Sequence, residues 1–109
     1  MSIQLPGTIQ TYIDASNRHD VPSILTCFDQ EAIVRDENQT RRGLPAIEAW
    51  VVETVDKYKF QFTPLGLREQ NAEYVVIIEV SGTFPNSPIK LDYHFGVAND
   101  KIQSLMIDS

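Results

Sequence analysis

Three side chains, those of Tyr12, Asp36 and Tyr93, could perform acid–base chemistry on a bound molecule. Asp36 ends a predicted strand in which the in-phase residues Ala32 and Val34 are apolar. A carboxyl group that faces an apolar cavity has a raised pKa and can act as a general base near neutral pH. Tyr12 and Tyr93 lie on apolar faces of a predicted helix and a predicted strand. Their buried hydroxyls need hydrogen-bond partners, and a substrate carbonyl is one option.

Each of these residues also has a purely structural interpretation. Asp36 could lie exposed at the end of its strand and pair with Arg41 or Arg42. Tyr12 could be a core tyrosine that bonds a backbone carbonyl, and Tyr93 could be a packed core aromatic residue. The sequence leaves these alternatives open.

Several aromatic residues are candidates for lining an apolar ligand pocket around these groups. They are Trp50, Tyr58, Phe62 and Phe28. Aromatic residues at helical or strand spacing also occur as ordinary core residues, so their pattern alone does not define a pocket.

Other chemistry finds little support in the chain. His19 and His94 belong to different predicted elements, and we expect both to face solvent. Cys27, the single cysteine, is expected to be a small core residue. His-x-x-His and Glu-x-x-His spacings, a Ser-His-Asp arrangement and a glycine-rich phosphate loop are all missing from the sequence. We therefore expect no metal and no cofactor.

Three helices are predicted to position the candidate residues. The first covers residues 6–18, with Ile9, Tyr12, Ile13 and Ser16 on one stripe. Asp20 caps a short second helix that has Pro22 in its first turn. The third begins at Pro45 and reaches about residue 59.

The remaining segments are predicted to be strands and turns. Residues 32–36 form a short strand, and the polar residues 37–42 form a loop. Strands follow at residues 60–70, 74–84, 89–98 and 102–108. Pro64 and Gly66 indicate an edge position or a bulge in the first of these four. Residues 85–88 form a turn, and Asn99-Asp100 a tight hairpin turn.

The predicted order α-α-β-α-β-β-β-β indicates an α+β fold with a single domain over residues 1–109. The last four strands are expected to form an antiparallel meander. Three helices cannot cover both faces of such a sheet, so we expect it to curve around them and leave a cone that is open at one end.

The composition favours an acidic, globular protein. The chain has 109 residues, with 42% hydrophobic and 22% charged residues, a net charge of -6 and a pI of about 4.7. Nucleic-acid binding needs clustered Lys and Arg, and a negative net charge also disfavours binding to an anionic membrane surface. We therefore expect neither a nucleic acid nor a membrane as a partner. No signal peptide and no membrane-spanning run are recognised, so a cytoplasmic location is the expectation.

Three stretches of the chain resemble the NTF2-like superfamily, and within it the SnoaL-like domains. Residues 12–20 resemble the end of the first helix, residues 24–34 the second helix and first strand, and residues 42–47 the Gly-x-x-Ala-Ile entry to the third helix. The resemblance covers nearly the whole chain. It implies the cone-shaped fold and an enclosed pocket.

Within the superfamily, the first half is most similar to bacterial ketosteroid isomerase. That similarity implies that Tyr12 donates to an oxyanion and that Asp36 shuttles a proton. The second oxyanion donor of that enzyme, a protonated aspartate, matches Tyr93 when the His94-Phe95 pair is aligned. Asp92 is one residue away and should point to the opposite face. The loop before Gly43 is also shorter here, so the isomerase pattern is incomplete.

SnoaL-like proteins include cyclases, hydratases and isomerases. The preferred hypothesis is therefore a pocket protein that abstracts a proton next to a carbonyl of a small apolar substrate. The alternatives are a ligand-binding domain without chemistry and a protein-interaction module. Val75 and Ile77 are apolar on the face opposite Val76 and Ile78, which predicts a homodimer through the outer face of the sheet.

Overall fold

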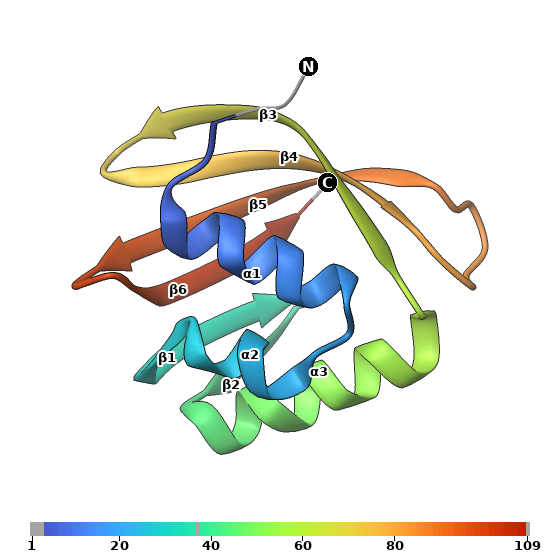
Figure 1. Cartoon of the computed structure of the whole chain (residues 1–109), viewed down its shortest axis with the longest axis horizontal. Helices are drawn as coiled ribbons and strands as arrows, with labels where there is room; N and C mark the ends of the chain where they lie inside the picture. The colour runs from blue at the N-terminus through green and yellow to red at the C-terminus, as the bar shows by residue number, and fades with distance from the viewer. Residues whose placement is uncertain (1–3, 37, 109) are drawn as a thin grey trace.

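Three helices pack against one face of a curved six-stranded sheet (Figure 1). The computed structural model describes residues 4–36 and 38–108. Along the chain the elements are α1 (Gly7–Asn17), α2 (Val21–Thr26), β1 (Phe28–Asp36), β2 (Gln39–Arg42), α3 (Leu44–Tyr58), β3 (Gln61–Gln70), β4 (Glu73–Ser81), β5 (Ile89–Ala98) and β6 (Lys101–Asp108). The predicted α+β, NTF2-like fold is confirmed.

The helices begin and end where the sequence predicts, within about two residues. Asp20 caps α2: its carboxylate accepts hydrogen bonds from the Ser23 N–H at 3.3 Å and from the Ser23 hydroxyl at 2.7 Å. The left-handed residue Lys59, with φ of 48°, ends α3. Within the described ranges, no helix has the length and apolar character needed to cross a membrane.

The sheet has the strand order β2-β1-β6-β5-β4-β3. The predicted antiparallel meander β3–β6 is present, and Asn99 and Asp100 form its last hairpin turn with positive φ angles of 54° and 60°. β3 lies at the edge of the sheet, and its register shifts between Pro64 and Gly66, as predicted. β1 joins the meander through parallel pairing with β6.

The prediction of a loop over residues 37–42 is wrong. Residues 39–42 form β2, which pairs antiparallel with β1, and residue 37 lies outside the described residues. The side chains of β2 are mostly exposed, so the strand carries no apolar alternation. Its structure comes from backbone pairing with β1 at the sheet edge, which a local pattern does not reveal.

Strand β1 is also longer than predicted, because it begins at Phe28 rather than at residue 32. Asp29, Gln30 and Glu31 are polar and half-buried or exposed, and they hide this first part of the strand from a search for alternation. The observed order is therefore α-α-β-β-α-β-β-β-β, with one more strand than predicted.

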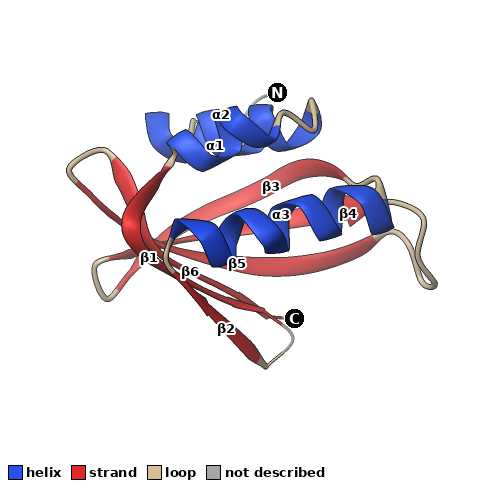
Figure 2. Ribbon diagram, turned by 90° about the horizontal axis from the view of Figure 1, so that it is seen from below, coloured by secondary structure: helices blue, strands red, loops and turns tan. Residues whose placement is uncertain are grey.

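The two faces of the central strands differ in character. On β5, Leu91, Tyr93 and Phe95 face the helices, whereas Asp92 and His94 lie on the outer face. Figure 2 shows the three helices gathered on the inner side, with α3 crossing the sheet next to β1 and β2. A cavity remains between the helices and the curved sheet, because the helices are too few to fill it.

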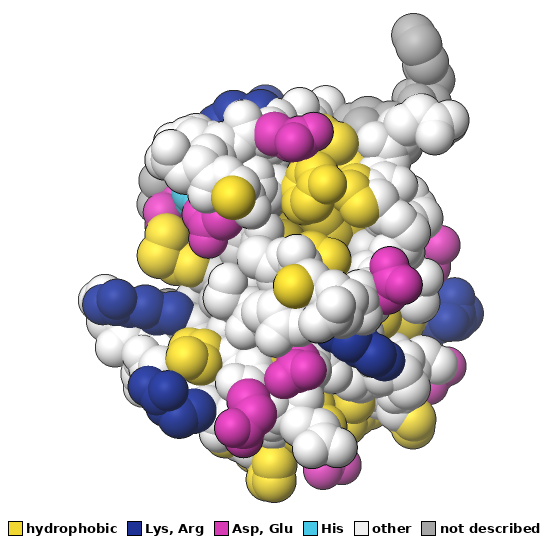
Figure 3. Space-filling view, turned by 90° about the vertical axis from the view of Figure 1, so that its left-hand side faces the viewer, with side chains coloured by type: hydrophobic (Ala, Val, Ile, Leu, Met, Phe, Trp, Pro, Cys, Tyr) yellow, Lys and Arg dark blue, Asp and Glu magenta, His cyan; other side chains and the backbone are white. Residues whose placement is uncertain are grey.

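Charges of both signs are scattered over the end of the molecule that carries the β3–β4 and β5–β6 hairpins. On this face, lysine and arginine side chains lie in separate places among acidic ones, and hydrophobic side chains gather in one patch (Figure 3). This face therefore has no continuous basic surface.

Candidate functional site

The candidate site is a cavity of about 290 Å³ lined by all three helices and by strands of the sheet. Its volume lies at the small end of the range that is usual for ligand pockets. Most of its lining is apolar. The lining residues are Tyr12, Ser16, Ile24, Asp36, Trp50, Val51, Thr54, Tyr58, Phe60, Phe62, Val80, Phe84, Pro85, Ile89, Leu91, Tyr93 and Ile107.

All three residues proposed for catalysis line this one cavity. Tyr12 comes from α1, Asp36 from the last position of β1, and Tyr93 from the middle of β5. Asp36 reaches the cavity because it is in phase with Val34, which is fully buried, while Arg35 points outward. The fold therefore brings together residues that are 24 and 57 positions apart in the sequence.

Asp36 is held by an aromatic donor that the sequence analysis did not pair with it. The indole Nε1 of Trp50, on α3, donates to Asp36 Oδ2 at 3.3 Å. Arg41 Nη1 donates to the main-chain carbonyl of Asp36 at 3.4 Å, and its guanidinium lies 6.0 Å from the centre of the Trp50 ring. Arg41, one of the two arginines in the structural interpretation of Asp36, thus contacts the backbone of Asp36 and the ring of the tryptophan.

The two tyrosine hydroxyls are suited to donate hydrogen bonds. Burial raises the pKa of Tyr12 far above its usual value; a hydrogen bond with Ser16 opposes this, and the charge of Asp36 adds to it. Burial also raises the pKa of Tyr93, with further contributions from Tyr12 and Asp36. Both hydroxyls therefore keep their protons at physiological pH and can donate to an acceptor in the cavity.

A cluster of aromatic rings fixes the positions of the two tyrosines. The ring of Tyr12 lies 5.6 Å from Phe95 and 6.4 Å from Phe62, and the ring of Tyr93 lies 5.5 Å from Phe62 and 6.2 Å from Phe95. Phe60 stacks on Phe62 at 4.6 Å. Because each tyrosine contacts the same two phenylalanines, neither ring can move without disturbing the other.

The end of α1 is tied to β3 by two polar side chains, those of Asn17 and His19. Asn17 Nδ2 donates to the Phe62 carbonyl at 3.0 Å, and the Phe62 N–H donates to Asn17 Oδ1 at 2.7 Å. His19 Nε2 lies 2.7 Å from the Phe60 carbonyl. The expectation that His19 faces solvent is wrong, because the half-buried imidazole bonds this strand.

Four residues were expected to line the pocket, and the structure places three of them there. Trp50, Tyr58 and Phe62 line the cavity, whereas Phe28 lies behind Tyr12, with the two ring centres 5.8 Å apart in an edge-to-face contact. Phe28 is the first residue of β1. Its ring supports Tyr12 from outside the cavity.

The chain belongs to the family of SnoaL-like domains, whose family model matches residues 9–104. The residues that match this model include Tyr12, Asp36, Trp50 and Tyr93. The family assignment rests on the sequence, independently of the cavity geometry above.

Solved structures agree with this assignment. A Sinorhizobium meliloti protein whose proposed function is polyketide cyclase superposes with a TM-score of 0.91 at 31% identity over 95% of each chain. SalBIII, an epoxide hydrolase/cyclase-like enzyme in pyran ring formation in salinomycin, has a TM-score of 0.82 at 20% identity, over 93% of this chain and 86% of that one. A comparison with curated proteins gives no significant match.

A third structure shares the fold at lower identity. It is a Catenulispora acidiphila protein with a ketosteroid isomerase-like fold in complex with trimethylamine, with a TM-score of 0.83 at 13% identity over 97% of this chain and 87% of that chain. This likeness supports the fold that the sequence resemblance implied.

Proposed function

We propose that this protein catalyses proton abstraction next to a carbonyl group of a small, largely apolar substrate. The observation that carries the proposal is the convergence of one carboxylate and two protonated phenol groups on a single apolar cavity. An enolisation needs these two kinds of group: a base for the carbon-bound proton and donors for the oxygen that becomes negative.

In this proposal Asp36 is the base. The carboxylate accepts the proton from the carbon next to the carbonyl, and the electron pair of that C–H bond moves into the developing enolate. Tyr12 and Tyr93 donate hydrogen bonds to the enolate oxygen. Proton return from Asp36 to another carbon would complete an isomerisation. In a substrate that carries a second carbonyl, the enolate carbon would attack that carbonyl carbon, its C=O π bond would break, and its oxygen would take the proton from Asp36, which completes an aldol cyclisation. Neither route requires a cofactor.

The lining of the cavity supports an apolar substrate. Apart from Asp36 and the two tyrosines, its polar side chains are Ser16, Thr54, Trp50 and Tyr58, and Trp50 already donates to Asp36. Burial of a charged or highly hydroxylated molecule would leave polar groups without partners. A compact ring or chain with one carbonyl fits this environment.

The test is hydrogen–deuterium exchange, because it detects proton abstraction even when the natural product is not known. A panel of small ketones, such as cyclohexanone, indanone and menthone, is incubated with the protein in D₂O and followed by proton NMR. We expect exchange next to the carbonyl in the ketones that bind. Asp36→Asn should lower the exchange rate by at least about 100-fold.

Two controls separate catalysis from binding. Asp56→Asn removes an exposed carboxylate on α3 and should leave exchange unchanged. Binding of the same ketone to Asp36→Asn, measured by calorimetry, should persist. Ketone binding without exchange in the wild-type protein would contradict the proposal and support a ligand-binding domain. Stable capture of a protein partner, with no ketone binding, would support an interaction module.

A further inference from the structure

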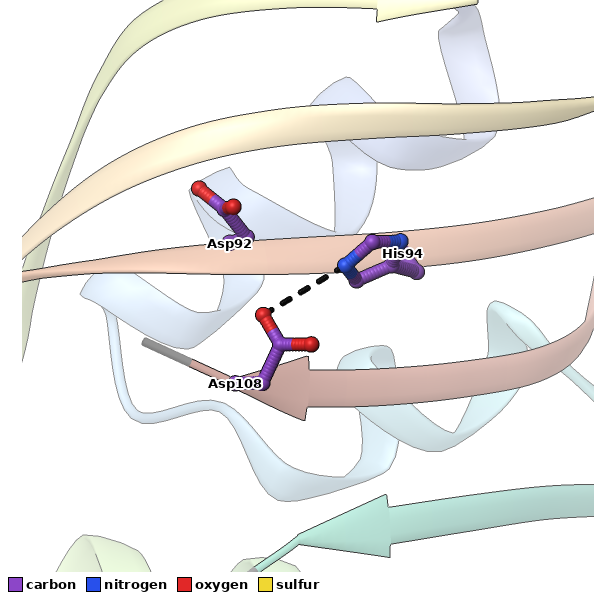
Figure 4. Close-up of side chains that lie close together, drawn as sticks. All are labelled: Asp92, His94 and Asp108. Atoms are coloured by element: carbon purple, nitrogen blue, oxygen red, sulfur yellow. Dashed lines mark ion pairs between the residues drawn. The ribbon is translucent and has the colours of Figure 1, made fainter. Parts of the chain in front are cut away.

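The outer face of the sheet carries a cluster of three metal-ligating side chains that the proposed function does not use. Asp92 and His94 come from β5, and Asp108 comes from the end of β6 (Figure 4). Each residue offers one ligand atom, and these three atoms all lie within 4.8 Å of one another. Tyr93, between Asp92 and His94, points the opposite way into the cavity, so the cluster and the cavity lie on opposite faces.

Strand register explains how the cluster forms. Asp92 and His94 are two residues apart and therefore share a face, and Asp108 is the direct cross-strand partner of Asp92. Two carboxylates in this arrangement repel each other. Arg68 offsets the repulsion only in part, since its Nη2 is 3.9 Å from Asp92 Oδ2 and its side chain is half exposed.

The imidazole of His94 provides an independent observation. Its Nε2 atom is shut off from solvent and has no hydrogen-bond partner among the described residues, although it lies 3.5 Å from Asp108 Oδ1. A buried polar atom without a partner is rare in folded proteins. The expectation that His94 faces solvent is wrong, since its side chain is only 16% exposed.

The distance between His94 and Asp108 suits two ligands of one metal ion. Two ligand atoms that are each about 2.1 Å from a tetrahedral ion lie about 3.4 Å apart, which is close to the separation of His94 Nε2 and Asp108 Oδ1. In Figure 4 the Asp92 carboxylate points away from the other two side chains, and it supplies the third ligand only when it turns from Arg68 toward them. One imidazole nitrogen and two carboxylate oxygens are a donor set that Zn²⁺ and related divalent ions accept, with water in the open position.

We propose that Asp92, His94 and Asp108 bind a divalent transition-metal ion of the Zn²⁺ type on the outer face of the sheet. The ion clamps β5 to β6, neutralises the two facing carboxylates and gives His94 Nε2 a partner. The site is structural, and it is independent of the chemistry proposed for the cavity. Ligand spacing along a single segment led to the expectation of no metal, and such spacing cannot reveal a site that is assembled across two strands.

The test is calorimetric titration of the full chain with ZnCl₂, together with thermal unfolding with and without the metal. The wild-type protein should bind one Zn²⁺ per chain and unfold at a higher temperature in its presence. His94→Gln should lower the affinity at least about tenfold and remove the thermal shift. Asp108→Asn, at a half-exposed position that tolerates substitution, should do the same.

Matched variants identify the ligands. His19→Gln and Cys27→Ser change the other imidazole and the single thiol, and both should keep the wild-type affinity. Arg68→Gln should tighten binding, because it releases Asp92 and removes a positive charge from the site. The proposal is overturned if the wild-type protein binds no Zn²⁺, if His94→Gln and Asp108→Asn bind as the wild type does, or if binding is lost in Cys27→Ser.

Discussion

Trp50 and Asp36 are joined across the cavity wall by a hydrogen bond of 3.3 Å from the indole nitrogen to the carboxylate. The bond links α3 to the end of β1, and it aims the proposed base while the apolar part of the indole lines the pocket. A donor to the charged form of a carboxyl group stabilises that form. Trp50 is therefore a positioning residue for Asp36.

Replacement of Trp50 by Phe keeps an aromatic ring in the wall and removes this donor. A hydrogen bond to a charged group contributes about 1.5 kcal/mol or more, and one pH unit corresponds to about 1.4 kcal/mol. We therefore expect the carboxyl group of Asp36 to lose its proton about one pH unit higher in Trp50→Phe than in the wild type. NMR titration of the side-chain carboxyl carbon of Asp36 measures this change in titration midpoint without a substrate.

Tyr58→Phe is the matched control for that experiment. Tyr58 lies on the same helix and lines the same cavity, and its substitution by Phe keeps the Trp50 donor to Asp36. Its substitution should leave the titration of Asp36 in place. An unchanged midpoint in Trp50→Phe would show that the indole does not stabilise the carboxylate.

The buried tyrosines predict a loss of stability at high pH. The pKa values of Tyr12 and Tyr93 are higher in the folded protein than in the unfolded chain, where a tyrosine titrates near its usual value of about 10. Above that value the unfolded chain loses protons that the folded protein keeps, so the free energy of unfolding falls as the pH rises. Below it, both states keep the proton and the contribution is fully present.

Urea unfolding at a series of pH values from about 9 to 11 measures this effect. Above pH 10, each of the two tyrosines should lower the free energy of unfolding by at most about 1.4 kcal/mol per pH unit. Tyr12→Phe and Tyr93→Phe should each make the decline less steep, and the double variant should do so most. Identical slopes in all four proteins would mean that these hydroxyls ionise in the folded state as easily as in the unfolded one.

The sequence predicted best those elements whose pattern is local. The residue range 89–98 for β5 follows from strict alternation, the cap of α2 from Asp20 before Pro22, and the bulge in β3 from Pro64 and Gly66. In each case, the residues that specify the element lie within it. The buried face of α1 was predicted equally well, since its apolar residues follow helical spacing.

Three features that depend on distant segments were not predicted. β2 has no apolar pattern and exists through its pairing with β1. The bond from Trp50 to Asp36 depends on how α3 packs on the sheet, and the cluster of Asp92, His94 and Asp108 depends on the register of β5 and β6. Alternation did place Asp92 and His94 on one polar face, so two of the three residues of that cluster could be grouped from the sequence.

The homodimer through the outer sheet face stays a prediction, but the apolar residues that could form its interface differ from those the sequence indicated. Val75 is only 1% exposed within the single chain, so it needs no partner. The remaining apolar residues on this face include Met106, which is 39% exposed, and the half-buried Ile77. If the face forms a dimer, Met106→Glu should convert it to a monomer, because a buried charge without a partner is costly.

Light scattering at high micromolar concentration, in the presence of a metal chelator, measures the oligomeric state without any contribution from bound metal. Val52→Glu is the control, since Val52 is 49% exposed on α3, away from the sheet. A monomeric wild-type protein, or a dimer that survives Met106→Glu, would contradict assembly through this face.

The hydrogen bonds of Asn17 to the backbone of β3 are expected to stabilise the fold. Its amide satisfies both the N–H and the carbonyl of Phe62, whose ring lies next to both tyrosines. Asn17→Ala leaves both part-buried backbone groups without these bonds, so we expect the free energy of unfolding to fall by about 1–3 kcal/mol. Urea unfolding at neutral pH measures the loss, and Gln10→Ala, which removes only an exposed hydrogen bond on α1, should cost much less. Equal losses in the two variants would mean that water replaces Asn17 at the backbone of Phe62, and that the aromatic cluster alone holds β3 against α1.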